Sequence, residues 1–87
     1  MTHSLPYLKY HQIEVGETYY FSVPEPLNNA GEFIARVLKK HVFDDVGYHS
    51  KLYKVLVDNP PLGIYVWIAE EDEYGRITQK SMVRYVT

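Results

Sequence analysis

The segment LGIYVWIAEEDEYGRITQKSMVRYV, residues 62–86, carries the strongest structural signal in this 87-residue chain. A β-branched and aromatic run from Ile64 to Ala69 comes first, a charged turn containing Gly75 follows, and strand-forming residues resume from Ile77 to Val86. Two such runs joined by turn residues are typical of a β-hairpin. The segment therefore predicts two neighbouring antiparallel strands.

Three further strands are predicted upstream, over residues 18–23, 32–42 and 51–58, because apolar and polar side chains alternate there. Segments rich in Pro, Asn, Asp and Gly separate the strands at 24–31, 43–50 and 59–63. Residues 1–13 follow neither a strand period nor a helical one and are predicted to form an irregular N-terminal arm. Five short strands over residues 14–87 predict an all-β domain, a small barrel or a compact sandwich.

Composition narrows the class of protein. A chain of 87 residues supports one small hydrophobic core, and a formal net charge of -2 gives no general attraction to nucleic acid or to anionic lipid. The chain has no cysteine, so disulfides and thiolate metal sites are excluded. The N-terminus lacks a signal-peptide pattern, and the longest apolar run is far too short to span a bilayer. We expect a cytoplasmic protein without a membrane partner.

Two motifs resemble the small SH3-like barrels, which include Tudor and KOW modules. VGETYYF, residues 15–21, is similar to their glycine-acid entry into the first strand, and GRITQKSMVRYV, residues 75–86, is similar to their closing strand, single 3₁₀ turn and short last strand. The resemblance implies a five-stranded SH3-like (Tudor-like) barrel with the turn at residues 79–82. In length and in its lack of catalytic residues the chain also resembles the anti-restriction inhibitors of T4-like phages, a family described as mimicking DNA, although its charge is less acidic than that role requires.

Alternation in the fourth strand separates two faces. Ile64, Val66 and Ile68 would fill the core and leave Tyr65 and Trp67 pointing outward. A bare aromatic patch of this kind marks a partner-binding site. We predict that Tyr53 and Tyr20 join it. Alternatively the patch is covered, either by the arm through Leu5, Tyr7, Leu8 and Tyr10 or by a second copy of the chain in a homodimer.

Charged residues form two opposite groups. Glu70, Glu71, Asp72 and Glu73 make an acidic hairpin, to which Asp44 and Asp45 add two carboxylates from another loop. They are either a solvated turn that protects the sheet edge or a surface that offers carboxylates where a DNA-binding protein expects phosphates. The second group is basic, and it predicts nucleic-acid binding as the rival function, with Phe43 or Tyr48 stacking on bases: Lys39, Lys40, Lys51 and Lys54.

Three other kinds of site have weaker support. A methyl-lysine cage needs several ring faces around a cation, and the loops offer only Phe43 and Tyr48. An oxygen and nitrogen metal site would use His41, Asp44, Asp45 and His49, whose spacing matches no established pattern. No nucleophile elbow, phosphate-binding glycine loop or HExxH motif is present, so catalysis and a cofactor are not expected.

The sequence therefore predicts a non-enzymatic binding protein. The leading hypothesis is an inhibitor or modulator of phage type, which docks on a host nucleic-acid-handling protein through its acidic hairpin and the face of Tyr65 and Trp67. The alternatives are a nucleic-acid-binding barrel and a Tudor-like reader of methylated peptides.

Overall fold

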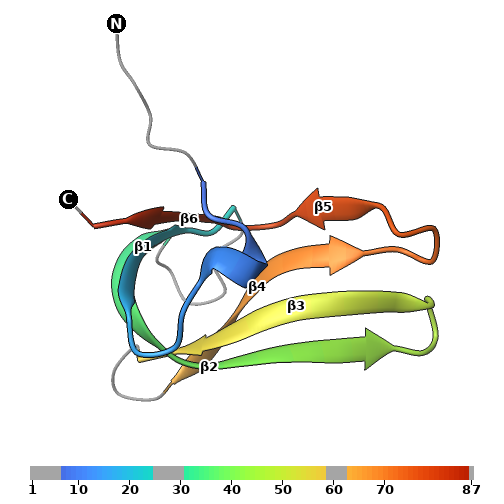
Figure 1. Ribbon diagram of the computed structural model, residues 1–87, viewed down its shortest axis with the longest axis horizontal. Coiled ribbons are helices and arrows are strands. Elements are labelled where there is room, and N and C mark those ends of the chain that lie inside the picture. The colour runs from blue at the N-terminus through green and yellow to red at the C-terminus, as the bar shows by residue number, and fades with distance from the viewer. Residues whose placement is uncertain (1–6, 25–30, 59–62, 87) are drawn as a thin grey trace, which may run out of the picture.

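The computed structural model describes residues 7–24, 31–58 and 63–86. A short 3₁₀ turn, η1 (Tyr10–Gln12), precedes the strands (Figure 1). The strands are β1 (Thr18–Ser22), β2 (Glu32–Asp45), β3 (Ser50–Val57), β4 (Ile64–Glu71), β5 (Ile77–Gln79) and β6 (Met82–Tyr85). The all-β prediction is therefore confirmed. The predicted loops at residues 24–31 and 59–63 lie mostly outside the described residues.

All six strands belong to one antiparallel sheet with the order β5-β4-β3-β2-β1-β6. The long strand β2 pairs with β1 through residues 32–36 and with β3 through residues 37–45, and the sheet curves strongly along it (Figure 1). Six strands replace the predicted five because the last predicted strand is interrupted at Lys80 and Ser81. A bend without a 3₁₀ turn separates β5 from β6 at this point.

The two hairpins β2–β3 and β4–β5 extend to the same end of the molecule (Figure 1). The first is longer than predicted, because Phe43, Asp44 and Asp45 belong to β2 and only residues 46–49 form the connection. In the second, β4 continues through Glu70 and Glu71 before the turn. Residues predicted to lie in loops thus hold fixed positions on the sheet.

A hydrophobic core lies on the concave side of the sheet. Phe21, Val37, Val55, Val57 and Ile68 are fully buried there. Phe21 stacks on Phe33 at a centroid separation of 5.4 Å and meets the Tyr19 ring edge-on at 6.5 Å. The predicted inward set of β4, with Val66 and Ile68 buried, is confirmed.

The segment before β1 contributes to this core instead of forming an arm outside it. Leu8 and Ile13 are 6% and 1% exposed, and the Leu8 amide donates to the Val83 carbonyl of β6. The Lys40 ammonium donates to the Ile13 carbonyl at 2.7 Å. The predicted boundary after residue 13 therefore separates residues that share one core. Leu5, predicted to belong to the arm, lies outside the described residues.

Two β-bulges change which side chains face the core. The β2–β3 register shifts between Val37 and Lys39, and the β3–β4 register shifts opposite Tyr53 and Lys54, at Ile68. One extra residue on a strand reverses the face of every residue that follows it. Within the described part of the chain, no helix is long and apolar enough to cross a membrane.

Candidate functional site

Tyr65 and Trp67 lie on the solvent-facing side of β4, as the alternation predicted. Their exposed fractions are 39% and 38%, whereas the intervening Val66 is 3% exposed. On the neighbouring strands, Lys54 is paired in register with Trp67 and His41 with Lys54. The face therefore continues from β4 across β3 to β2.

Aromatic rings from β2 and β4 meet over the middle strand of this face. The Phe43 ring lies 5.4 Å from that of Tyr65 in an edge-on contact, and the His41 ring lies 4.2 Å from that of Phe43. The Lys54 ammonium lies between the two sides, 5.4 Å from the Phe43 centroid and 6.0 Å from the Trp67 centroid. Three adjacent strands thus form one mixed aromatic and basic surface.

Trp67 is flanked by a second ammonium group. Lys80, which follows β5, places its Nζ 4.8 Å from the Trp67 centroid and 4.0 Å from a Glu70 carboxylate oxygen. An ammonium over an indole ring is attracted by the ring quadrupole. We name the whole surface the aromatic–lysine face, and its members are His41, Phe43, Lys54, Tyr65, Trp67 and Lys80.

The Trp67 ring and backbone are held in place by hydrogen bonds. The indole Nε1 donates to the Ala69 carbonyl at 3.1 Å, and the buried Ser81 Oγ donates to the Trp67 carbonyl at 2.8 Å. The ring edge is therefore tied to the sheet, while part of the ring face remains open to solvent. A side chain fixed in this way loses little conformational entropy when a ligand packs on it.

The four lysines predicted to form one basic site lie on opposite faces of the sheet. Lys54 belongs to the aromatic–lysine face, and Lys39 lies on the same side because it shares the strand period of His41. Lys51 shares the period of the buried Val55 and so faces the other way. The predicted four-lysine site is wrong as a single surface.

Lys40 has a structural environment on the opposite side. Its ammonium lies 4.4 Å from the Tyr10 centroid and donates to a backbone carbonyl of the N-terminal segment. Burial lowers the pKa of Lys40, and the nearby Glu14 carboxylate opposes that shift. This lysine fastens η1 to the sheet.

Tyr53 and Tyr20 do not join the aromatic pair of β4, which corrects the prediction. Tyr53 lies on the concave side, where its ring meets Tyr10 at 5.0 Å. Tyr20 belongs to β1, which β2 and β3 separate from β4, and the Arg84 guanidinium lies 5.0 Å from its ring centroid. The N-terminal Tyr10 and Leu8 likewise pack on the concave side, so within the described residues this segment leaves Trp67 uncovered.

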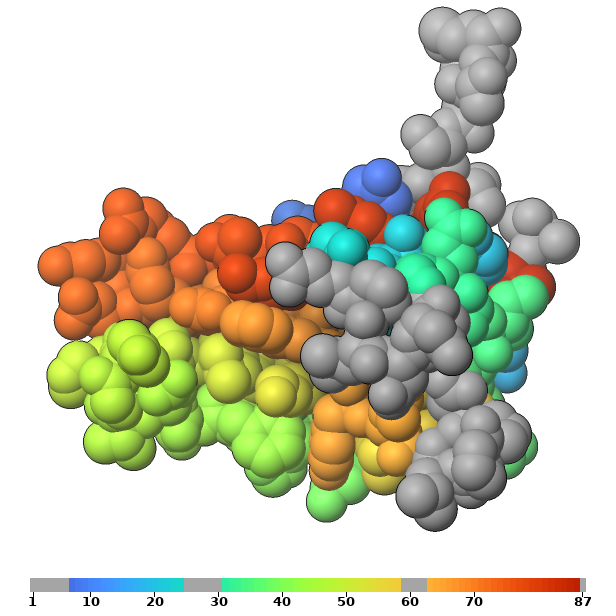
Figure 2. Space-filling model, turned by 180° about the vertical axis from the view of Figure 1, so that it is seen from behind, coloured from blue at the N-terminus to red at the C-terminus, as the bar shows by residue number. Residues whose placement is uncertain are grey.

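The predicted acidic loops lie at one end of the molecule. The strand register places Asp44 opposite Lys51 and Lys51 opposite Glu71, and the tips of both hairpins lie side by side (Figure 2). We name this region the acidic end, comprising Asp44, Asp45, Glu70, Glu71, Asp72 and Glu73. Apolar side chains project from the same tips, with Val46, Tyr48 and Tyr74 exposed by 80%, 80% and 73%.

Half of the carboxylates at the acidic end have partners within the chain. Glu70 pairs with Lys80, and Glu71 accepts a hydrogen bond from the Tyr53 hydroxyl at 2.7 Å. That hydrogen bond is the main reason why the pKa of Tyr53 is raised. These two glutamates therefore offer less free charge to a partner than their number suggests.

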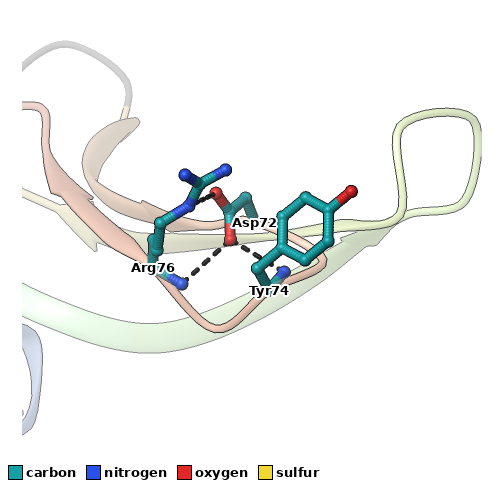
Figure 3. Close-up of polar contacts among 3 residues, drawn as sticks. All are labelled: Asp72, Tyr74 and Arg76. Atoms are coloured by element: carbon teal, nitrogen blue, oxygen red, sulfur yellow. Dashed lines mark hydrogen bonds and ion pairs between the residues drawn. The ribbon is translucent and has the colours of Figure 1, made fainter.

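Asp72 organises the turn between β4 and β5 (Figure 3). Its Oδ1 accepts hydrogen bonds from the backbone amides of Tyr74 and Arg76, both at 2.9 Å, and its Oδ2 accepts one from the Arg76 Nε at 2.7 Å. The Arg76 backbone amide is the largest cause of the lowered pKa of Asp72. Gly75 adopts a φ of 82°, which glycine tolerates without strain. The carboxylate is thus a structural part of the turn.

The residues of the two weaker site hypotheses are dispersed. Phe43 contacts His41 and Tyr65 on the sheet, whereas Tyr48 projects from the hairpin tip, so the two rings do not form a cage. The described residues contain no group of three or more metal-ligating side chains, and the predicted metal candidates are all described: His41, Asp44, Asp45 and His49.

The sequence did not predict that His41, Phe43 and Lys80 would join the face of Tyr65 and Trp67. Phe43 is predicted to stack on bases from a loop and His41 to join a metal site, whereas both belong to β2 and lie in contact on this face. Lys80 is predicted to lie in a turn. Alternation continued from the buried Val37 would place His41 and Phe43 on the core face, and the bulge between Val37 and Lys39 turns both to the outer face. Lys80 has no local signal, since only folding brings it to Trp67.

Comparison of the chain with protein-family models, with curated proteins and with solved structures finds no match. The resemblances to SH3-like barrels and to anti-restriction inhibitors therefore stay predictions. The geometry of the described residues is the basis for inferring function.

Proposed function

We propose that this chain is a non-enzymatic nucleic-acid-binding protein that uses the aromatic–lysine face. The observation that carries this proposal is the placement of two lysine ammonium groups beside Trp67, with the rings of Phe43 and Tyr65 on the same face. Lysines attract phosphates, and aromatic rings stack on bases. The combination suits nucleic acid better than the four-lysine hairpin that the sequence suggested.

The local positive charge of this face supports nucleic-acid binding, although the net charge of the chain is negative. Lys39, Lys54 and Lys80 lie on the face or at its border, and the Glu70 carboxylate that accompanies them lies toward the acidic end. The carboxylates are concentrated at the hairpin tips. Because exposed charges separated by more than about 10 Å are largely screened at 0.1 M salt, a formal charge of -2 does not prevent local attraction.

The finer fold assignment is part of the same proposal. An SH3-like barrel is supported by the strand order, in which β5 and β6 occupy the two edges although only Lys80 and Ser81 connect them. The sharing of β2 between β1 and β3 also supports it. We place the protein in the cytoplasm, because the absence of cysteine suits a reducing compartment.

Neutralising the lysines beside Trp67 tests the function. We expect Lys54→Gln and Lys80→Gln each to weaken binding of a labelled mixed-sequence oligonucleotide. Each change should also lower the magnitude of the slope of log affinity against log salt by about 0.7 to 0.9, because one phosphate contact is lost. Fluorescence anisotropy measured from about 50 to 200 mM salt gives the slope.

Lys51→Gln is the matched control, since it removes the same charge from the opposite face. It should leave the slope unchanged. An equal loss in Lys51→Gln, or binding that does not depend on salt, would contradict the assignment of this face.

The acidic end supports a second candidate function, docking on the basic surface of a protein that handles nucleic acid. The strand register brings Asp44, Asp45, Glu70 and Glu71 to this end, and the β4–β5 turn adds Asp72 and Glu73. Tyr48 and Tyr74 are exposed in the turns of the same two hairpins. Aromatic side chains within a polar rim are typical of protein interfaces. An inhibitor of anti-restriction type would dock in this way.

The second candidate predicts a different pattern of sensitivity. The triple variant Asp44→Asn, Asp45→Asn, Glu73→Gln should lose a partner protein captured from the source organism, because the complementary charge is removed. Lys54→Gln with Lys80→Gln should retain that partner. Capture by affinity chromatography and mass spectrometry measures both, and equal capture by the triple variant would exclude the acidic end as the docking surface.

A further inference from the structure

The arrangement around Trp67 also indicates which form of nucleic acid is bound. We infer that the aromatic–lysine face binds single-stranded nucleic acid, with an unpaired base stacked on Trp67 and the Lys54 and Lys80 ammonium groups transferred from the ring to the flanking phosphates. This inference rests on the proposed function and extends it to a substrate class and a binding mode.

The Trp67 ring can stack on a ligand through its face but has no free hydrogen-bond donor on its edge. The indole N–H, which is the only polar group of the side chain, is already used by the Ala69 carbonyl at 3.1 Å. What Trp67 can offer a ligand is therefore the face of its ring, which accepts any base. Because the N–H has no capacity left, this residue contributes little sequence discrimination.

The ammonium groups of Lys54 and Lys80 lie where each could leave the Trp67 ring and contact a phosphate of the bound strand. Nζ of Lys80 is 4.8 Å and Nζ of Lys54 is 6.0 Å from the Trp67 centroid, so both ammonium groups lie over the ring. An ammonium contact with a ring at a half-exposed site contributes less than a base stacked on that ring. A base can therefore displace the ammonium groups, and each regains a partner in the phosphate of the same nucleotide or the next.

Neighbouring rings extend the surface beyond a single base. Tyr65 precedes Trp67 by two residues on the same strand, is 39% exposed, and contacts Phe43 from β2. These rings supply further apolar surface for adjacent bases. Phe43 contacts both His41 and Tyr65, so it links the rings of β2 to those of β4.

A duplex does not match this surface. In a duplex the faces of the bases are covered by their neighbours in the stack, and the edges are read by helices or ribbons that enter a groove. The aromatic–lysine face is a sheet surface of β2, β3 and β4 with Lys80 at its border, and its rings lie across adjacent strands instead of along a single ribbon. Sheet surfaces with exposed aromatics instead bind bases that are already unstacked.

The chain contains one tryptophan, so its fluorescence reports directly on Trp67. The full chain is titrated with three probes of equal length: a deoxythymidine decamer, an abasic deoxyribose-phosphate decamer, and a duplex of the thymidine decamer with its complement. We expect the thymidine decamer to quench the tryptophan emission and to bind at least about 5-fold tighter than the abasic decamer, the affinity ratio that one stacked base supplies. The duplex should bind no tighter than the abasic probe.

Substitution of Trp67 provides the second arm, measured by anisotropy of labelled probes. Trp67→Ala should weaken binding of the thymidine decamer by about 5- to 150-fold and leave binding of the abasic decamer unchanged. Trp67→Phe, which keeps a ring, should restore part of the loss. Circular dichroism of each variant checks that the sheet has formed. Binding of the abasic decamer by the same variant checks that the lysines still contact phosphates.

The outcomes separate the two proposals. Equal affinity for the thymidine and abasic decamers, or an unchanged affinity in Trp67→Ala, would overturn the stacking mode while nucleic-acid binding through the lysines stands. Tighter binding of the duplex would overturn the single-strand preference. A failure of all three probes to bind at low salt would overturn the proposed function together with this inference.

Discussion

Phe21→Ala is expected to lower the free energy of unfolding by about 3 to 5 kcal/mol, the range for truncating a buried aromatic side chain. Phe21 is fully buried between Tyr19 and Phe33, and its ring stacks on Phe33 at 5.4 Å. Small domains have total stabilities of about 5 to 15 kcal/mol, so this variant will be at best marginally folded. Urea unfolding followed by the fluorescence of Trp67 measures the change.

Tyr48→Ala is the control for aromatic truncation at an exposed site, because Tyr48 is 80% exposed at the β2–β3 turn. Its unfolding free energy should stay within about 0.5 kcal/mol of the unsubstituted chain. A loss below about 1 kcal/mol in Phe21→Ala would show that the ring is not part of a close-packed core.

The second large effect concerns the segment before β1. Ile13→Ala should lower the free energy of unfolding by about 2 to 5 kcal/mol, because Ile13 is 1% exposed and its removal leaves a cavity in the core. If residues 7–13 were an arm outside the core, the same substitution would leave the free energy of unfolding nearly unchanged. Thermal or urea unfolding of the full chain provides the measurement.

Ile34→Ala offers a matched control, since it removes the same atoms from a side chain that is 57% exposed on β2. We expect it to cost well under half as much as Ile13→Ala, because no buried cavity forms. Similar losses in the two variants would mean that residues 7–13 do not pack on the sheet in solution.

These two experiments also affect the functional tests. The Lys40 ammonium ties β2 to the Ile13 carbonyl, whereas Lys54 and Lys80 contact no backbone carbonyl of that segment and lie on the other face. A substitution on the concave side should therefore mainly lower the free energy of unfolding. A substitution on the aromatic–lysine face should mainly weaken binding. Measuring unfolding for every binding variant separates the two effects.

Local pattern was sufficient to predict most of the strands. Thr18–Ser22, Ser50–Val57 and Ile64–Glu71 agree with the predicted strands to within one or two residues, because a period of two is a property of consecutive residues. The outward direction of Tyr65 and Trp67 followed from the same alternation. Tyr53 has the parity of Val55 and Val57 and therefore faces the core, so the prediction that it joins the outer patch is wrong.

The sequence by itself determined the all-β class, the main strands and the two faces of β4, since each of these depends on neighbours along the chain. Only the tertiary structure decided the rest. The bulge between Val37 and Lys39 put Lys40 instead of Lys39 on the face of Val37, and packing between distant segments buried Leu8 and Ile13. Folding also brought Lys80 to Trp67. Register and long-range packing depend on pairs of residues far apart in the sequence, and no local period records them.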